Sequence, residues 1–389
     1  MSKKERRSVP VLRFKGFTDD WEQRKWKDIL LVNSGKDYKH LSRGSIPVYG
    51  TGGYMLSVNK ELSNVDAIGI GRKGTIDHPQ YLKAPFWTVD TLFFMTPKND
   101  INIDFAFGIS RTVNWKKYDE STGLPSLSKK SIDNISIKLP NYDEQIKIGQ
   151  MISQIDKVIS LQQRKLDQFK QLKTMCLANM FFNSANHVTK LRFVGFTDNV
   201  EKQSFGNTIS HKSGTSIEKY FSPKGQYKVI SIGSYGLNGE YIDQGIRAVS
   251  NEKTNSHLIR KGELSMVLND KTDGKILGRT LLINKDNEYV VNQRSEIIKP
   301  NPALWDTQFA FTYLNGPFRK KVIRIMQGGT QKYINFSSVE KLNVFLPEVQ
   351  EQQKIGFLFK KIDAIICHHQ QKILSLKQIR KFLLQNLFI

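Results

Sequence analysis

The 389-residue chain contains only two cysteines, Cys176 and Cys367, which lie 191 positions apart in separate apolar stretches. Thiols so few and so far apart exclude a disulfide-stapled secreted domain and indicate reduced core residues. No uncharged apolar run reaches the roughly 18 residues that a bilayer span requires, and no apolar segment follows the basic opening MSKKERRSVP. These absences indicate a soluble protein that stays in the cytoplasm and does not enter a membrane.

Acidic residues are the minority charge, since 36 Asp and Glu stand against 59 Lys and Arg, giving a formal net charge of +23 and a pI of about 9.8. A surface this basic exceeds what solubility requires and indicates a polyanionic partner. The basic residues are interleaved with 41 aromatic residues and many amides instead of forming one tail. That distribution favours nucleic acid as the partner.

Catalytic signatures are also missing. The G-x-G-x-x-G from Gly69 to Gly74 is followed by TIDHPQYLKAPFW, which has two prolines and no helical period, so no helix N-terminus could face a pyrophosphate. The same loop lacks the ending of a P-loop, and NPAL at 301–304 falls short of the Asn-Pro-Pro-aromatic motif of amino-methyltransferases. Neither His368 nor His369 has carboxylate or cysteine neighbours at metal-ligand spacing. We therefore expect a non-catalytic chain without a metal or cofactor of its own.

What the chain does contain is a pair of internal repeats. LRFKGFTD, starting at Leu12, returns as LRFVGFTD at Leu191, with seven of eight residues identical at an offset of 179. LPNYDEQIKIGQMISQID from Leu139 matches LPEVQEQQKIGFLFKKID from Leu346 at nine of eighteen positions and an offset of 207. Like ends therefore enclose unlike middles. We interpret the octapeptide as a strand or turn at the base of each domain, without a DNA contact, and expect the chain's end to lie near Leu12.

The segment after each Leu-Pro predicts a helix of about 40 residues, or about 60 Å. Apolar residues recur at alternating spacings of four and three, which places them along one face of the helix. A helix this long must bury that apolar face, the seam, against a partner. The simplest partner is the other copy, so we expect an antiparallel coiled coil with Gln162 and His369 at equivalent polar seam positions. The seam includes Ile148, Ile155, Ile159 and Leu166 in the first helix and Ile355, Ile362, Ile366 and Ile373 in the second.

The unlike middles have the patterns of mixed α/β domains. In the first middle, strands are predicted at 66–71, 86–95 and 135–139, with a short helix at 104–115. In the second, strands are predicted at 227–233, 262–269, 275–284 and 289–300, with a helix near 305–326 that breaks at Gly316-Pro317. The predicted fold is two α/β (α+β) domains in a pseudo-two-fold arrangement, joined by the two long helices.

Several loops in the middles combine glycine with basic or amide side chains. Glycine lets a backbone approach a ligand, Arg and Lys contact phosphate or guanine, and Asn and Gln match adenine. An ordinary solvated surface is the alternative for each of these loops, and for the polar segments 121–131 and 327–338. The candidate DNA-contacting residues are Arg72, Lys73, Gly74 and Thr75 in the first middle, and Lys271, Lys275, Arg279, Asn292, Gln293, Arg294, Thr330, Gln331 and Lys332 in the second.

Two variable middles, each followed by a long helix that opens Leu-Pro-x-x-x-Glu-Gln, resemble the specificity subunit of type I restriction-modification systems. The resemblance extends over nearly all of residues 12–389 and includes IPVYGTGG at 46–53 and LGRTLLI at 277–283. It implies a DNA-reading chain whose two middles are target recognition domains, one for each half of a bipartite site.

The same resemblance implies domain boundaries, partners and cofactors. It divides the chain into a first recognition domain at 1–140, a central spacer helix at 141–183, a second recognition domain at 184–347 and a C-terminal spacer helix at 348–389. The helices would dock two modification subunits, which methylate adenine with S-adenosylmethionine, and restriction subunits, which use ATP and Mg. The positions expected in the subunit interface and coiled coil are the eight apolar seam residues together with Glu144, Gln145, Glu351 and Gln352.

Two other classes of protein remain open from the residues themselves. A basic coiled-coil scaffold that binds RNA or acidic proteins would explain the helices and the charge. It gives no reason for unlike middles between like ends. A methyltransferase or nuclease with an appended coiled coil would require catalytic motifs that the sequence lacks.

Overall fold

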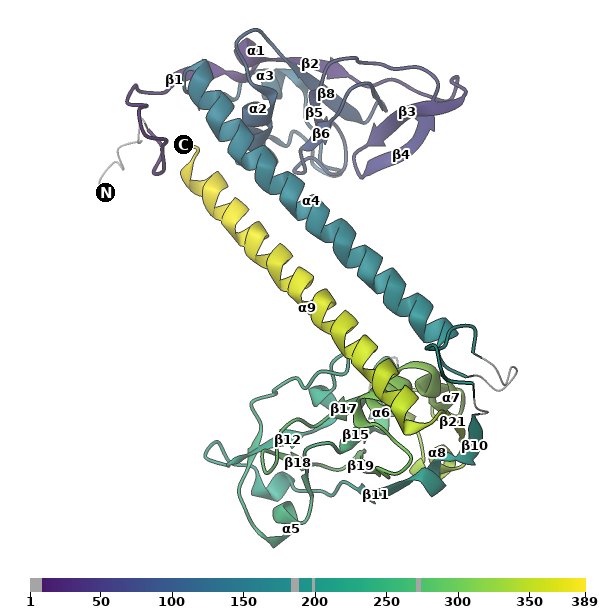
Figure 1. Cartoon of the computed structure of the whole chain (residues 1–389). Coiled ribbons are helices and arrows are strands. Elements are labelled where there is room, and N and C mark those ends of the chain that lie inside the picture. Colours follow the sequence, from purple (N-terminus) through teal and green to yellow (C-terminus); the bar gives the residue numbers. More distant parts are fainter. Residues whose placement is uncertain (1–8, 183–188, 198–199, 271–273) are drawn as a thin grey trace. The chain divides into compact units, whose positions relative to one another are not determined.

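The computed structural model describes residues 9–182, 189–197, 200–270 and 274–389. The chain divides into two units: unit 1 comprises Met1–Lys165 together with His369–Ile389, and unit 2 comprises Leu166–His368. Each unit holds one globular part and one portion of each long helix, α4 (Tyr142–Asn179) and α9 (Val349–Asn386) (Figure 1). The two long helices are therefore confirmed.

The globular part of unit 1 consists of β1 Glu22–Lys25, α1 Trp26–Ile29, β2 Leu30–Ser34, β3 Arg43–Gly50, β4 Gly53–Val58, β5 Ala67–Gly71, β6 Gln80–Leu82, β7 Trp87–Thr88, β8 Leu92–Pro97, α2 Ile103–Ser110, α3 Lys129–Asp133 and β9 Ser136–Leu139. One sheet is antiparallel with the order β2-β8-β5-β6, and a second has the order β4-β3-β7 with β3 parallel to β7. The ribbon β1-β9 closes the domain directly before α4. Trp26, Phe105 and Trp115 lie at the centre of the buried core.

The globular part of unit 2 consists of β10 Glu201–Ser204, β11 Ile209–Ser213, β12 Tyr227–Ile230, β13 Arg247–Ala248, α5 Glu252–Asn255, β14 Leu258–Ile259, β15 Leu264–Val267, β16 Asn269–Asp270, β17 Thr280–Leu282, β18 Tyr289–Val291, β19 Ser295–Pro300, α6 Thr307–Tyr313, α7 Arg319–Arg324, β20 Lys332–Tyr333, α8 Phe336–Glu340 and β21 Asn343–Leu346. Its antiparallel sheet has the order β11-β19-β15-β17, and its second sheet has the order β13-β12-β18-β14. The ribbon β10-β21 closes this domain directly before α9.

The two middles share one topology although their sequences share little. The sheets β2-β8-β5-β6 and β11-β19-β15-β17 connect in the same order, and each second sheet contains a parallel pair, β3 with β7 and β12 with β18. A helix follows the equivalent strand in both, α2 after β8 and α6 after β19. The prediction of two mixed α/β domains is thus confirmed, and the repeat extends through the unlike sequences.

Two predicted strands are each divided in the structure. Residues 86–95 form β7 and the start of β8, and residues 289–300 form β18 and β19. In both places the chain passes from one sheet to the other, which a single straight strand cannot do. The turn in unit 2 contains Arg294 at a φ of 73°, a conformation that non-glycine residues rarely adopt. The predicted break at Gly316-Pro317 is confirmed, since Gly316 has non-helical backbone angles between α6 and α7.

Within each unit, the portions of α4 and α9 run antiparallel. In unit 1, Asp156 pairs with Arg380 at 2.8 Å, and the Gln162 side-chain oxygen lies 2.7 Å from Nδ1 of His369. In unit 2, Lys173 pairs with Asp363 at 2.5 Å. Every apolar residue predicted for the seam is buried or half-buried. The predicted seam and the meeting of its polar residues are therefore confirmed.

The repeated octapeptide fastens the ends of the helices. In unit 1, the backbone NH of Leu12 donates to the carbonyl of Asn386 at 2.9 Å, and the Arg13 guanidinium makes two bonds of 2.9 Å to the buried Glu144 carboxylate. In unit 2, Leu191 donates to the carbonyl of Asn179 at 3.0 Å, and Arg192 pairs with Glu351. Each octapeptide therefore joins the end of one long helix to the start of the other. The expected proximity of Leu12 to the chain's end is confirmed.

The repeated helix start anchors the globular part. Gln145 donates to the carbonyl of Pro140 and accepts from the backbone NH of Asn102, the residue that caps α2. Gln352 makes the same contacts to Pro347 and to Asp306, the cap of α6. The two repeats have the same spacing of side chains, which gives both units the same contact between a short helix and a long one.

Candidate nucleic-acid interface

In unit 1 the predicted loop follows the buried strand β5 and reaches the surface. Arg72, Lys73 and Thr75 are exposed, and Gly74 has a φ of 88°, which glycine tolerates without strain. The Arg72 guanidinium lies over the ring of Phe93, 5.7 Å from its centroid. No helix begins directly after Gly74, as expected from the rejected dinucleotide motif.

This loop pairs with part of the polar segment 121–131 further along the chain. The backbone NH of Gly74 donates to the carbonyl of Pro125 at 2.8 Å, and Leu127 donates to the carbonyl of Arg72 at 2.9 Å. Lys73 forms a bridge with Ser126. The two segments, 72–75 and 125–127, therefore lie side by side, and 72–75 supplies the exposed basic side chains. We call them the unit 1 loop pair.

In unit 2 three predicted segments converge. Leu268 donates its backbone NH to the carbonyl of Arg294 at 2.9 Å and accepts from Ile334 at 2.9 Å. The Gln331 amide donates to the side-chain oxygen of Asn269 at 2.8 Å, and β16 pairs with β20 beside it. Segments that are tens of residues apart in sequence are thus brought together directly after the end of β15.

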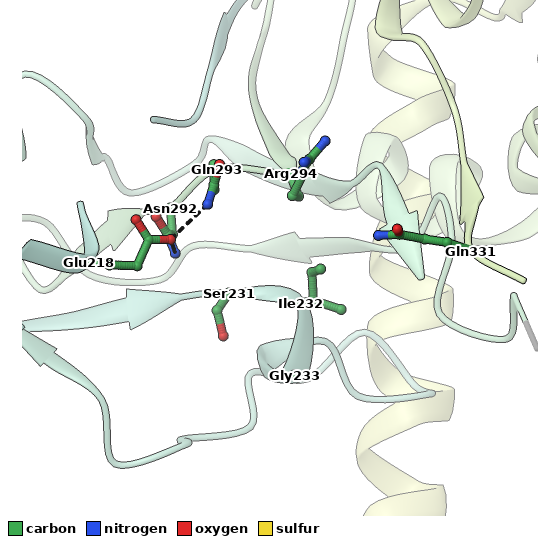
Figure 2. A pocket seen from close by; sticks show the side chains of 8 residues that line it. All are labelled: Glu218, Ser231, Ile232, Gly233, Asn292, Gln293, Arg294 and Gln331. Atoms are coloured by element: carbon green, nitrogen blue, oxygen red, sulfur yellow. Dashed lines mark hydrogen bonds between the residues drawn. The ribbon is translucent and has the colours of Figure 1, made fainter. Parts of the chain in front are cut away.

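A cavity of about 600 Å³ opens at this convergence and is lined by Glu218, Ser231, Ile232, Gly233, Asn292, Gln293, Arg294 and Gln331. We call it the unit 2 cavity. Figure 2 shows Gln293 directed toward Glu218, with Arg294 beside it and Gln331 on a separate segment. The Glu218 carboxylate accepts hydrogen bonds from Ser216, Asn292 and Gln293, which lower its pKa to about 2. The cavity therefore combines a carboxylate of lowered pKa with amide and guanidinium donors.

The prediction that Asn292 contacts DNA is wrong. Its side chain is buried, its amide nitrogen donates to Glu218 at 3.0 Å, and its oxygen accepts from the backbone NH of Ile217 at 3.3 Å. The oxygen that would accept from the adenine amine is therefore occupied within the domain, and burial keeps the whole side chain from a base edge. Asn292 supports the turn, whereas Gln293 and Arg294 are exposed.

Segment 269–279, whose basic residues were predicted to contact DNA, is held partly by two arginines. Lys271 lies outside the described residues, and Lys275 is exposed. Arg279 is half-buried, so that desolvation lowers its pKa, and its Nε donates to the carbonyl of Lys275 at 3.2 Å. Arg319, which was not predicted as a site residue, donates to the carbonyls of Lys275 and Leu277. Arg279 and Arg319 thus hold this turn from within.

The remaining predicted residues belong to the hairpin before α8. Gln327 and Tyr333 exchange backbone hydrogen bonds across it, which leaves Thr330 and Gln331 exposed near the tip. Lys332 is half-buried in β20, opposite Asp270. Of the predicted residues in this hairpin, Gln331 is the one that lines the unit 2 cavity.

The prediction that the carboxylates and amides at the helix starts contact another subunit is also wrong. Glu144, Gln145, Glu351 and Gln352 are between 0% and 3% exposed. Their partners are the arginines and backbone groups of their own unit, so another subunit cannot reach them. They are joints within the chain instead of contact residues.

Two sets of residues were missed by the sequence analysis. Glu218 lies 75 positions from Gln293, and no local pattern marks the pairing. Exposed apolar side chains on the long helices lie outside the seam: Val158, Leu161, Leu374, Ile379 and Phe382 in unit 1, and Met175 and Phe357 in unit 2. These residues could have been found as apolar positions that the 4-3 spacing leaves out.

Comparisons with known proteins identify the class of this chain. Residues 18–171 and 199–378 match the family model of the type I restriction modification DNA specificity domain. The chain therefore belongs to this family. It is the non-catalytic, DNA-recognising specificity subunit of a type I restriction-modification complex, and its partners are DNA and other subunits of that system.

Individual relatives have low sequence identity to this chain, but their alignments cover most of it. The type I restriction enzyme MjaVIII specificity subunit of Methanocaldococcus jannaschii is 21% identical over 314 residues, which is 78% of this chain and 71% of the relative. The MjaIX specificity subunit of the same organism is 20% identical in an alignment that covers 95% of this chain and 92% of the relative. The crystal structure of an S subunit from M. genitalium is similar with a TM-score of 0.70 and 14% identity, covering 98% of this chain and 99% of that one. That structural likeness shows a shared fold.

Proposed function

We propose that each unit reads one half of a bipartite site on double-stranded DNA, unit 1 through its loop pair and unit 2 through the surface around its cavity. The observation that carries this proposal is the convergence of three separate basic or amide-bearing segments in unit 2. In unit 1, exposed Arg72 and Lys73 supply the charge that phosphate contacts require. The loops also offer hydrogen-bonding groups suited to base edges.

We propose that two modification subunits and the restriction subunits dock on the long helices. The exposed apolar residues outside the seam support this proposal, because such residues on a charged helix favour contact with another protein. Met175 and Phe382 hold equivalent positions in the two helices, so the two units offer partners a similar side chain.

S-adenosylmethionine would be bound by the modification subunits, and ATP and Mg by the restriction subunits, in the cytoplasm. Among the helices that the structure describes, none has an apolar stretch long enough to cross a membrane.

The unit 1 loop pair can be tested by the salt dependence of DNA binding. Arg72→Ala and Lys73→Ala should each lower the slope of log K against log salt by about 1, because each removes one phosphate contact and its released counterion. The measurement is a fluorescence titration of the assembled complex with a duplex that contains its site, repeated across salt concentrations.

Lys15→Val is the matched control for this test. Lys15 is an exposed cation of the octapeptide, and the equivalent residue in the second copy is valine, Val194. The control should leave the slope unchanged. Equal slopes for all four proteins would show that the loop pair does not contact phosphate.

A further inference from the structure

The turn between β18 and β19 carries three polar side chains with different roles. Asn292 is buried, whereas Gln293 and Arg294 are exposed at the edge of the unit 2 cavity (Figure 2). The carbonyl of Arg294 accepts from Leu268, which holds the turn against β15. The backbone NH of Asn292 donates to the carbonyl of Ile230 at 3.0 Å, so backbone contacts on both sides of the turn set the position of Gln293.

Glu218 comes from a separate segment of the chain and fixes the Gln293 side chain by a direct hydrogen bond. One carboxylate oxygen of Glu218, Oε1, accepts from the amides of both Asn292 and Gln293, at 3.0 and 2.9 Å. Its other oxygen accepts from the Ser216 hydroxyl. With three donors on one carboxylate, Glu218 has little capacity left to accept from a cytosine amine. Glu218 therefore orients the neighbouring amides instead of contacting a base itself.

The pairing also settles which way the Gln293 amide faces. An ionised carboxylate can only accept hydrogen bonds, so the nitrogen of Gln293 must point toward Glu218 and the oxygen away from it. The nitrogen has a second proton, and among the described residues none donates to the Gln293 oxygen. An acceptor and a donor thus remain side by side on one exposed amide.

Such an acceptor and donor match the major-groove edge of adenine. Adenine presents its N6 amine as a donor and its N7 as an acceptor, and glutamine can bond to both at once. No other base offers this pair in the same geometry. The neighbouring Arg294 adds a positive charge next to the amide, which favours the approach of DNA.

We propose that Gln293 reads an adenine in the half-site bound by unit 2, and that Glu218 is the positioning residue that orients its amide. This inference rests on the proposed function of the unit 2 cavity as a DNA-reading surface. It assigns one base of the recognised sequence to one side chain. Asn292 takes part only by holding Ile217 and Glu218 in place.

The test uses the chain assembled with its modification subunits and sequencing of methylated adenines in cellular DNA. Gln293→Ala should weaken the preference for adenine at a single position of one half-site by roughly 5- to 150-fold, the range expected for one bidentate contact. Glu218→Gln keeps the shape but can donate as well as accept, so it should weaken the preference at the same position by a smaller factor. The double variant should be no less selective than Gln293→Ala alone.

Controls separate this role from a structural one. Glu252→Gln removes one charge from an exposed residue of unit 2 and should leave the whole motif unchanged. In every variant the half-site of unit 1 should also stay unchanged, which shows that the complex is folded and assembled. A uniform loss of methylation at all sequences, or an unaltered motif with Gln293→Ala, would overturn the assignment. A wild-type complex without any sequence preference would instead overturn the proposed function itself.

Discussion

Replacing Arg13 by alanine is expected to lower the free energy of unfolding by about 3–5 kcal/mol, because the change leaves the carboxylate of Glu144 buried without its cation. The Glu144 side chain is fully buried, and the Arg13 side chain is 14% exposed. Arg13 makes two parallel bonds to the carboxylate and a third to the carbonyl of Asp19, and the Glu144 contacts raise its pKa. Lysine at this position can make only a point contact and should recover part of the loss.

Urea unfolding of the isolated chain measures this effect, and a second variant separates charge from packing. Arg13→Ala combined with Glu144→Gln should be more stable than Arg13→Ala alone, because the buried group is then neutral. Arg24→Ala is the matched control, since Arg24 pairs with Glu22 on the surface, where such pairs contribute about 0–1 kcal/mol. If Arg13→Ala and Arg24→Ala cost the same, Arg13 and Glu144 do not form a stabilising joint.

The equivalent pair Arg192 with Glu351 explains why the octapeptide is present twice. Each arginine reaches a glutamate that starts a long helix, and each leucine before it binds the last turn of the other long helix. A joint made of a buried ion pair needs both partners, so the two repeats must occur together. The pairing of the octapeptide with the Leu-Pro-x-x-x-Glu-Gln segment could not be predicted, because 131 residues separate Arg13 from Glu144.

The long helices were the most predictable part of the fold. Their seam follows from local periodicity, because a helix of 38 residues without an internal proline repeats its contacts at every turn. Gln162 and His369 were predicted from the same pattern and do meet. The equivalent sheet order in the middles was not predictable, since strand order depends on pairings between residues far apart in the chain.

The sequence identified the loops of the candidate site and their residue types, but it did not identify the role of each side chain. Glycine and basic loops marked the unit 1 loop pair and the three segments around the unit 2 cavity. Whether an amide reads a base or supports a turn depends on its burial and its partners, and Asn292 and Gln293 differ in both although they are adjacent. Sequence could not distinguish them, because Glu218 and Ile217 come from another part of the chain.

The glycines of the repeated helix start should be the next most sensitive positions. A Cβ built on Gly149 would lie 2.5 Å from the side-chain oxygen of Asn102 and 2.8 Å from the backbone nitrogen of Phe105, at the capped start of α2. A Cβ on Gly356 would lie 2.8 Å from the corresponding atoms of Asp306 and Phe309. Backbone atoms cannot move aside as a flexible side chain can, so either alanine must push a short helix away from a long one.

Gly149→Ala and Gly356→Ala are each expected to lower the free energy of unfolding by about 1–3 kcal/mol, even though alanine favours a helix over glycine by about 1 kcal/mol. The loss combines overpacking with a disturbed helix cap. Gly123→Ala in unit 1 and Gly329→Ala in unit 2 are matched controls, since a Cβ at either position meets no atom within 4 Å. Thermal and urea unfolding should place both controls at or slightly above the wild type. Stability equal to the controls would mean that the long helices tolerate a wider spacing from α2 and α6, and that the shared glycine is not required by packing.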